Sequence, residues 1–468
     1  MATGYLSKTF GSAGNQKTFT TSVWLKRTVG TIANGDFSNT TYILSYDGGG
    51  SPIKRGAIWM YDTGGLVWGC NPSGSVWEPE SNVQLNGTTV LFRDPSAWYH
   101  IVFAVDTTQA TASDRLKCWI NGVQYSMSAY PAQNLDTGYN NSYTYNINRY
   151  APNGVNVSDV ALSHFHQIDG TAYDASYFGE FDATTGIWKP KTQPSVTYGT
   201  NGFFVKFENS GSMGTDSSGN ANNFTVNGSL TQTVDTPSNV FSTMNPLITG
   251  GLTLSNGNLT GTTSTTSTWV NMTSTLATSK GKYYFEVKKN DTMSYSSIVG
   301  ITSAEQYGST NNNKFSGSDA NGFGFYYNGL NALWYSITNG TNSSFGSSTP
   351  SPSNGDIYMC AVDLDNNYIY FGINGTWHNS GNPESGATGT GGINISSISG
   401  KEVYFCATNS YNTSGTSITN VNFGNGYFGT TAVSSATSDE SGLGIFEYTV
   451  PSGYYALCTK NINEQEYD

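Results

Sequence analysis

The stretch that most constrains the fold spans residues 97–124 and reads AWYHIVFAVDTTQATASDRLKCWINGVQ. Every position from 101 to 105 is apolar, which is typical of a central strand that is buried on both faces. The return run 116–120 alternates, with Leu, Cys and Ile sharing one face. Asn121-Gly122 then supplies the dipeptide that accepts positive φ in a tight turn. The stretch therefore predicts a β-hairpin at the centre of a sandwich.

A second copy of this pattern lies in residues 356–377, which read DIYMCAVDLDNNYIYFGINGTW. The tripeptide AVD at 361–363 repeats AVD at 104–106, and ING at 373–375 repeats ING at 120–122. Only the loop between the two tripeptides differs in length. Two similar hairpins in similar contexts predict two sandwiches of related build.

The composition favours strands over helices. Charged residues make up 11% of the 468 residues, against roughly 25% in an average globular chain. Aromatic residues reach 14%, which excludes a disordered chain, and 55 glycines with many Ser, Thr and Asn fill the intervals between short apolar runs. We expect an all-β protein with long polar loops and almost no helix.

Charge and cysteine usage exclude several classes of function. The net charge is −12 and no basic cluster occurs, so we expect no nucleic-acid partner. No apolar run approaches the roughly 20 residues of a membrane span, and the N-terminus lacks the pattern of a secretory signal. We therefore expect no membrane insertion and folding in a cytoplasm. Five cysteines without a CxxC pair are predicted to be reduced; they are Cys70, Cys118, Cys360, Cys406 and Cys458.

The first half resembles a known family through three segments. They read FTTSVWLKR at 19–27, the hairpin region 94–124, and HQIDGTAYDASYFGEFDATTGIWKPK at 166–191. Together they resemble the laminin-G/concanavalin A-like sandwich, in the version common in virion proteins of marine bacteriophages. The resemblance implies a sandwich over residues 1–195. Residues 196–245, whose run 198–228 is a usual continuation in such proteins, are expected to bridge to the next domain.

The second half resembles a SPRY-type sandwich over residues 246–430. Short apolar runs carry this resemblance, among them YYFEV at 283–287, GFGFY at 322–326 and VYFCATNSYN at 403–412. Residues 431–468 are expected to add a C-terminal strand and tail. The predicted fold is thus two tandem jelly-roll (concanavalin A-like) sandwiches.

Patterns for catalysis are incomplete. Glycan-cleaving enzymes with this type of sandwich often carry E-x-D-x-x-E on one strand, which places two carboxylates on one sheet face. Glu180 and Asp182 match its start, but Thr185 stands where the second glutamate belongs. No G-x-S-x-G elbow occurs. His164 and His166 lie two positions apart and would form at most half of a metal site, without a third ligand nearby in the sequence.

Calcium is the one cofactor for which the sequence offers candidates. Laminin-G-like sandwiches sometimes hold this ion at a loop rim. Asp363 and Asp365 alternate as the ligands of a calcium loop do, but the glycine and the bidentate glutamate of such a loop are missing. Asp and Asn are also expected in a hairpin loop for turn formation alone, so no cofactor is the main expectation.

Sugar binding is the remaining candidate chemistry. It needs flat aromatic faces beside short polar side chains. Four aromatic residues in or next to polar loops are the candidates: Trp68, Trp77, Trp334 and Tyr335. The alternative is that each of them caps its own core, which is the more common role of a large aromatic residue.

These features lead to one expectation with two alternatives. We expect a non-catalytic structural protein on the virion surface of a bacteriophage, as a fibre, knob or decoration protein, made in the host cytoplasm. Its lectin-like sandwiches would contact host-surface polysaccharide, and other virion proteins and copies of itself, as in a trimer, would be its partners. The alternatives are a purely architectural decoration protein without glycan binding and a glycan depolymerase.

Overall fold

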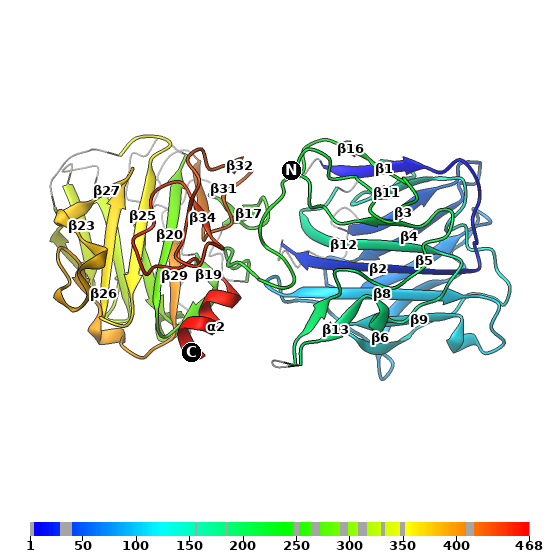
Figure 1. Ribbon diagram of the computed structural model, residues 1–468, viewed down its shortest axis with the longest axis horizontal. Coiled ribbons are helices and arrows are strands. Elements are labelled where there is room, and N and C mark those ends of the chain that lie inside the picture. The colour runs from blue at the N-terminus through cyan, green and yellow to red at the C-terminus, as the bar shows by residue number, and fades with distance from the viewer. Residues whose placement is uncertain are drawn as a thin grey trace. The chain divides into compact units, whose positions relative to one another are not determined.

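The computed structural model divides the chain into two compact units, Met1–Gln232 and Thr233–Asp468 (Figure 1). It describes residues 4–28, 40–154, 157–183, 186–247, 252–263, 272–290, 298–307, 316–328, 333–346, 352–408 and 416–467. Within these ranges nearly all regular structure is β-strand, and the two α-helices are short: α1 (Ala304–Tyr307) and α2 (Thr459–Tyr467). Each unit is an antiparallel jelly-roll sandwich, so the predicted fold class is confirmed.

The first unit is one continuous antiparallel path of strands that returns over itself around a core. Its order is β15-β12-β2-β8-β9-β10-β6-β5-β4-β3-β11-β1-β16, with β7 beside β6 and a separate β13–β14 hairpin. The strands are β1 (Tyr5–Thr9), β2 (Thr18–Arg27), β3 (Thr41–Asp47), β4 (Arg55–Met60), β5 (Leu66–Asn71), β6 (Glu80–Leu85), β7 (Thr88–Thr89), β8 (Trp98–Asp106), β9 (Leu116–Ile120), β10 (Val123–Met127), β11 (Thr144–Ile147), β12 (Val160–Asp169), β13 (Gly179–Phe181), β14 (Trp188–Pro190), β15 (Phe203–Val205) and β16 (Thr225–Asn227).

The second unit has two sheets that enclose a core of their own. Their orders are β17-β18-β30-β20-β25-β26-β27, with β28 beside β26, and β19-β29-β21-β22-β23-β24. The strands are β17 (Thr253–Ser255), β18 (Thr260–Thr263), β19 (Thr273–Thr278), β20 (Lys282–Lys289), β21 (Ile298–Ser303), β22 (Gly322–Asn328), β23 (Leu333–Thr338), β24 (Thr341–Ser344), β25 (Ile357–Asp363), β26 (Tyr368–Ile373), β27 (Thr376–Trp377), β28 (Ile393–Asn394), β29 (Val403–Thr408), β30 (Ser417–Asn422), β31 (Tyr427–Phe428), β32 (Thr431–Ala432), β33 (Thr437–Ser438) and β34 (Ile445–Phe446).

The central strand β8 is buried on both faces, as its sequence predicts. Phe103 and its alternate neighbours enter the sandwich core. On the outer face, Val102 packs against Ala175 and Phe178. These two residues belong to an irregular stretch, residues 171–183 and 186–198, that we name the first cover segment. An apolar outer face needs such a cover because a sheet of a two-layer sandwich otherwise meets water on that side.

The equivalent strand β25 of the second unit is covered in the same way. All seven of its residues are buried. Met359 and Ala361, on its outer face, pack against Phe446 and Tyr454. These belong to the second cover segment, residues 439–458, which ends just before α2. The sheet order around both hairpins also agrees, because β12-β2-β8-β9 corresponds to β30-β20-β25-β26.

The two hairpin turns match in atomic detail. Asn121 and Asn374 both have a φ of +48°, in the left-handed region that asparagine tolerates better than most residues. Each side-chain Oδ1 accepts the backbone N–H at the start of the neighbouring strand, from His100 at 2.7 Å and from Ile357 at 2.9 Å. Related build is therefore visible at the level of single hydrogen bonds.

The division of the chain falls inside the expected bridge, residues 196–245. The part up to Gln232 belongs to the first unit, where β15 extends the sheet beside β12 and β16 extends it beside β1. The part from Thr233 belongs to the second unit, where Phe241 forms a β-bridge with Cys458. Residues 431–468 also belong to the second unit and supply its cover segment and α2.

All five cysteines are buried free thiols. Cys70 and Cys118 lie in the core of the first unit, and Cys360 lies in that of the second. Burial raises the pKa of every one of them, to about 12 for Cys406. They act as small apolar residues.

The turn geometry gives a stability prediction. Asn121→Ala should destabilise the first unit by about 2 kcal/mol, because it leaves the His100 N–H without its acceptor and puts alanine at positive φ. Asn121→Gly keeps the turn conformation and should lose roughly half as much. Urea unfolding of the purified variants measures both values.

Asn86 is the matched control. It also precedes a glycine at positive φ, with φ +51°, but no hydrogen bond of its side chain is present among the described residues. Asn86→Ala should therefore cost about 1 kcal/mol, the strain of alanine at positive φ without the loss of a hydrogen bond. An equal loss for Asn86→Ala and Asn121→Ala would show that the side-chain hydrogen bond of Asn121 contributes nothing.

Candidate functional site

Trp68 does not offer a face for a sugar, contrary to the expectation from its loop-like surroundings. Its side chain is fully buried in the first core and stacks on Tyr139 with ring centroids 5.5 Å apart. The reason is that β5 lies between β4 and β6, and all six of its residues are buried. Cys70, two residues further along, is buried for the same reason.

Trp77 is half-buried, and its ring already has partners. It packs 5.3 Å from the ring of Trp59, and the Arg55 guanidinium lies over it at 5.2 Å. A cation over an indole face is a favourable contact that occupies that face. Trp77 therefore acts as the edge of a surface aromatic cluster with Tyr42 and Tyr150.

The two candidates in the second half lie together on β23. The backbone of Trp334 pairs with Tyr327, and its side chain lies outside the described residues. Tyr335 is half-buried and stacks on Tyr326 at 5.5 Å. The four sugar-binding candidates are thus divided between the two units, and the structure does not bring them into one site.

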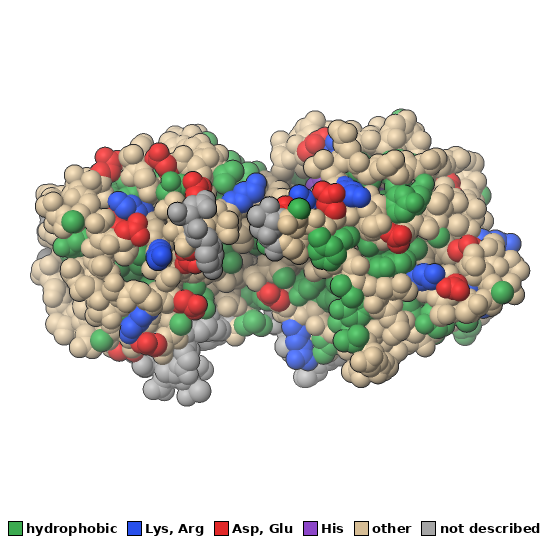
Figure 2. Space-filling model, turned by 60° about the horizontal axis from the view of Figure 1, so that its bottom comes forward, with side chains coloured by type: hydrophobic (Ala, Val, Ile, Leu, Met, Phe, Trp, Pro, Cys, Tyr) green, Lys and Arg blue, Asp and Glu red, His purple; other side chains and the backbone are tan. Residues whose placement is uncertain are grey.

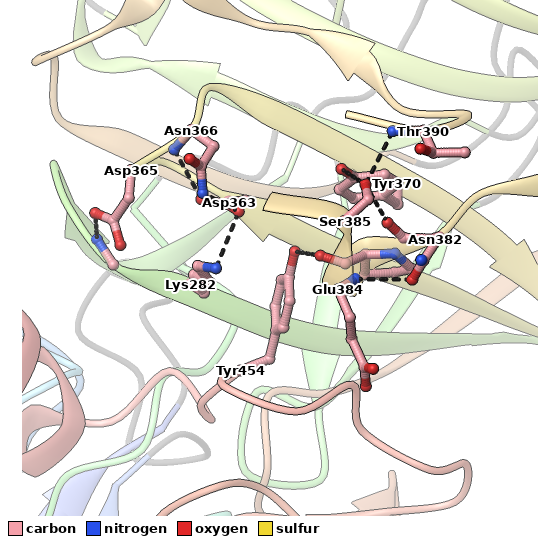
Figure 3. Close-up of polar contacts among 12 residues, drawn as sticks. Lys282, Asp363, Asp365, Asn366, Tyr370, Asn382, Glu384, Ser385, Thr390 and Tyr454 are labelled. Carbon is pink, nitrogen blue, oxygen red and sulfur yellow. Dashed lines mark hydrogen bonds and ion pairs between the residues drawn. The ribbon is translucent and has the colours of Figure 1, made fainter. Parts of the chain in front are cut away.

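The calcium candidates are engaged in other bonds (Figure 3). Asp363 is completely buried, lies 3.3 Å from the ammonium of Lys282, and accepts the backbone N–H and side-chain N–H of Asn366 at 2.9 and 2.8 Å. Asp365 accepts the N–H of Gly281 at 2.9 Å. A carboxylate neutralised by lysine and used by a turn is a poor ligand for calcium, so these residues do not fit the ion.

Metal chemistry gains no support from the histidines either. His164 has a φ of +47° at a bulge of β12, which interrupts the strand alternation that we assumed for His164 and His166. His166 is buried, stacks on Phe204 at 3.9 Å and bonds to the hydroxyl of Tyr198 at 2.9 Å. Among the described residues no group of three His, Cys, Asp or Glu side chains could hold a metal ion.

His100 is paired with a serine but does not activate it. Its Nδ1 accepts the indole N–H of Trp188 at 2.9 Å, and indole is only a donor. Burial lowers the pKa of His100 to about 3, so the ring is neutral and Nε2 carries its proton. Nε2 therefore donates to Ser22 Oγ, 2.9 Å away, whereas a general base would have to accept from it.

Glu180 and Asp182 are held by a lysine on the surface. Lys189 on β14 lies 3.9 Å from Glu180 and 3.0 Å from Asp182, across the β13–β14 hairpin. Both carboxylates are thus engaged by the same ammonium, and Thr185 still stands where the pattern of glycan-cleaving enzymes has its second glutamate.

The structure presents a different site in the first unit, at the edge of the first cover segment. A pocket of about 630 Å³ opens there over the outer face of β8 and β9. Its walls combine aromatic, acidic and small polar side chains. They are Ala104, Asp106, Gln109, Asp114, Lys117, Trp119, Thr171, Ala172, Tyr173, Asp174 and Tyr177.

Three aromatic side chains form the apolar part of this pocket. Trp119 stands on the outer face of β9, opposite Val102 of β8, and is half-buried. Tyr173 and Tyr177 come from the cover segment, with ring centroids 4.4 Å apart. Tyr177 is 40% exposed. The rings thus come from a sheet and from the segment packed on it.

The polar groups of the pocket are arranged by turns. Burial alone would raise the pKa of Asp106, but hydrogen bonds from Thr108, Gln109 and Thr18 outweigh it and lower this pKa. Asp114 lies 3.0 Å from Lys117. Asp174 uses one oxygen to accept the N–H of Ser176. The oxygens of Asp106 and Asp174 are therefore held in fixed positions by the N–H and O–H groups that donate to them.

Only part of this site carries a signal in the sequence. In LKCWI, strand alternation places Trp119 on the outward face together with Lys117, which is a local signal that its ring lies outside the sandwich core. Tyr173 and Tyr177 carry no such signal, because their place beside Trp119 depends on how the cover segment packs.

Comparisons with known proteins give similarity to solved β-sandwich structures. No family model and no curated protein matches the chain. Its structural neighbours include the PSpry domain of TRIM65 (12% identity, TM-score 0.29, 38% of this chain and 91% of that chain) and the SPRY domain of human HERC1 (14%, 0.29, 38% and 96%). Stonustoxin is a third (14% identity, TM-score 0.26, 39% of this chain and 27% of that chain).

The buried histidines predict acid destabilisation of the first unit. Burial lowers the pKa of His100 to about 3 and that of His166 well below 6.5 in the folded chain. As pH falls, the unfolded chain therefore binds protons at a higher pH than the folded chain does. The free energy of unfolding is then highest above pH 6.5. Below pH 6.5 it decreases by about 1.4 kcal/mol per pH unit for each histidine. His166→Phe should flatten the pH dependence of unfolding by one such increment. Urea unfolding at pH 7.5 and 5.5 measures this, and an unchanged slope in the variant would contradict it.

Proposed function

We propose that this protein is a non-catalytic carbohydrate-binding protein and that the pocket around Trp119 is its binding site. The observation that carries the proposal is the meeting of Trp119, Tyr173 and Tyr177 with the side chains of Asp106, Asp114 and Asp174 on one open surface. Apolar faces of sugar rings stack on aromatic side chains, while hydroxyl groups donate to carboxylate and amide oxygens.

The acceptors around the pocket suit hydroxyl groups. Asp174 has a second carboxylate oxygen beyond the one that bonds Ser176, and Gln109 donates to Asp106 through its amide nitrogen, so its amide oxygen remains available. Trp119 and Tyr177, which also line the pocket, each carry a donor group on the aromatic ring. This alternation of donors and acceptors around aromatic faces distinguishes a sugar site from a purely apolar groove.

The same geometry favours binding over hydrolysis. A retaining glycosidase needs one carboxyl group with a raised pKa as general acid. Hydrogen bonds lower the pKa of Asp106, and the ammonium of Lys117 lies 3.0 Å from Asp114. The pocket carboxylates therefore fit the role of fixed hydrogen-bond acceptors, and we propose no enzymatic activity.

The biological setting that we propose is the surface of a bacteriophage particle. This rests on the resemblance of residues 19–27, 94–124 and 166–191 to phage virion sandwiches. Several copies in a symmetric assembly would raise the avidity of weak individual sites for a host polysaccharide. Lys and Arg side chains lie singly or beside acidic groups on the face in view (Figure 2), an arrangement without the basic stripe of a nucleic-acid partner.

Particle labelling tests this setting. An antibody to the loop at residues 108–113, all exposed, should place gold on intact particles whose genome encodes the chain. The segment Leu66–Asn71 is unsuitable as an epitope because it is buried. Gold at a tail tip or fibre fits host recognition, gold over the head fits decoration, and unlabelled particles together with absence of the chain from their mass spectrum would reject the virion setting.

Substitution of the aromatic residues tests the binding site. Trp119→Ala and Tyr177→Ala should each weaken the strongest ligand found on an array of bacterial polysaccharides about tenfold or more, because each removes a stacking face worth about 1.4 kcal/mol. Isothermal titration calorimetry gives the affinities.

Phe181→Ala is the matched control, since Phe181 is 58% exposed but lies outside the pocket. Its affinity should stay within twofold of the parent chain. Equal effects of Phe181→Ala and Trp119→Ala would remove the pocket from consideration. Silence of the array with a folded protein that binds particles would favour the architectural alternative.

A further inference from the structure

The second unit contains a pocket of its own, with a different lining. It has a volume of about 490 Å³ and lies where the second cover segment meets β25, β27 and the turn that follows them. It is lined by Met359, Gly375, Trp377, Gly381, Asn382, Pro383, Glu384, Tyr448, Thr449, Val450 and Pro451. All of these residues belong to the second unit, so the pocket is complete within it.

The walls of this pocket combine two aromatic side chains with apolar and polar residues. Trp377 stands at the end of β27, and Tyr448 comes from the cover segment. Pro383 and Pro451 are rigid and offer no backbone donor. The polar lining is limited to Asn382, Glu384 and Thr449, far fewer polar groups than surround the pocket of the first unit.

Glu384 is the one charged residue of the lining, and no Lys, Arg or His lines the pocket. Its Oε1 accepts the backbone N–H of Ser452 at 2.8 Å, which fixes the side chain and leaves Oε2 for a ligand. Figure 3 shows the carboxylate extended away from the turn that Asn382 and Ser385 form. Glu384 is therefore an acidic group at the pocket without a basic side chain in the same lining.

A buried carboxylate beneath the cover segment holds the aromatic wall in place. Glu286 on β20 accepts the backbone N–H groups of Glu447 and Tyr448 at 2.9 and 2.8 Å, and the hydroxyl of Tyr284 at 3.0 Å. Gly375 comes so close to Tyr448 that an added Cβ would lie 3.1 Å from its ring. Tyr448 is thus positioned before any ligand arrives.

We infer that this pocket binds an organic ammonium group, such as the trimethylammonium of choline or the side chain of a lysine. Aromatic faces attract cations through the ring quadrupole, and a carboxylate at the same rim adds charge complementarity. The apolar walls contact the methyl or methylene groups of such a ligand. A neutral sugar would find few hydrogen-bond partners here, whereas a cation gains from Trp377, Tyr448 and Glu384 together.

This inference is independent of the carbohydrate site, because the two pockets lie in different units. It adds a second ligand class to the protein. The net charge of −12 favours encounter with cationic groups in general, so the test must separate binding in the pocket from attraction to the surface.

The experiment titrates the full chain with choline chloride, with Nα-acetyl-lysine methylamide, and with 3,3-dimethylbutan-1-ol, which has the shape of choline without its charge. Saturation-transfer NMR and tryptophan fluorescence report binding. We expect one of the two cations to bind at least five times more tightly than the neutral isostere. Preference for choline points to a quaternary headgroup, and preference for the lysine derivative points to a protein side chain.

Two variants assign the binding to the pocket. Glu384→Gln keeps an oxygen for Ser452 but removes the charge, and should weaken the cation at least fivefold. Glu440→Gln is the matched control, because Glu440 accepts the N–H of the adjacent Gly453 at 2.9 Å and lies outside the pocket. It should change the affinity less than twofold. Circular dichroism confirms that both variants fold.

Three outcomes would overturn the inference: equal binding of the neutral isostere, equal loss in both variants, or no response to either cation at concentrations up to the solubility of the probe. A fourth outcome would also overturn it: binding of methyl glycosides that is lost in Glu384→Gln would show that the ligand of this pocket is a sugar and not a cation. None of these outcomes affects the substitutions at Trp119.

Discussion

Both sandwiches depend on a central strand that is apolar on its two faces. A sheet in a two-layer sandwich has only one core to face, so the outer faces of β8 and β25 require a further layer. The chain supplies that layer with cover segments that are mostly irregular and contain only short strands, such as β13, β14 and β34. Such a cover does not follow a pleated sheet along its whole length. Both pockets open at the margins of these cover segments. The need to cover the outer faces of β8 and β25 therefore determines where the two pockets lie.

A chain with few charges anchors its covers and loops through buried carboxylates that accept backbone N–H groups. Asp169 accepts from Asn15 and Asn201, at 2.6 and 2.9 Å. Asp439 accepts from Gly444 and Ala456, at 2.9 and 2.8 Å. Glu286 does the same for the second cover, and its burial raises its pKa to about 7. Asp169 and Glu286 thereby join segments far apart in sequence, whereas Asp439 closes contacts within the second cover segment.

The hairpins could be predicted from the sequence because strand alternation and the Asn-Gly turn are local properties. The burial of both faces of the central strand of the first hairpin also followed from residues 101–105 alone. The aromatic residues show the opposite case. A tryptophan near glycine and asparagine reads as loop-borne, yet Trp68 is in a strand flanked by two others, and this depends on pairing between distant segments. Tyr173 and Tyr177 reach Trp119 only through the packing of the cover segment, which no periodicity encodes. Turn-forming Asp363 resembled a metal ligand because both roles require the same oxygens.

The burial of the five thiols affects how the folded chain responds to oxidants and reductants. A thiol must ionise and meet its oxidant to react, and burial opposes both steps at all five cysteines. The fold also gains nothing from a disulfide, so reductants have no bond to break. The side chains of the five cysteines therefore contribute to the two units through packing alone, as other small apolar side chains do.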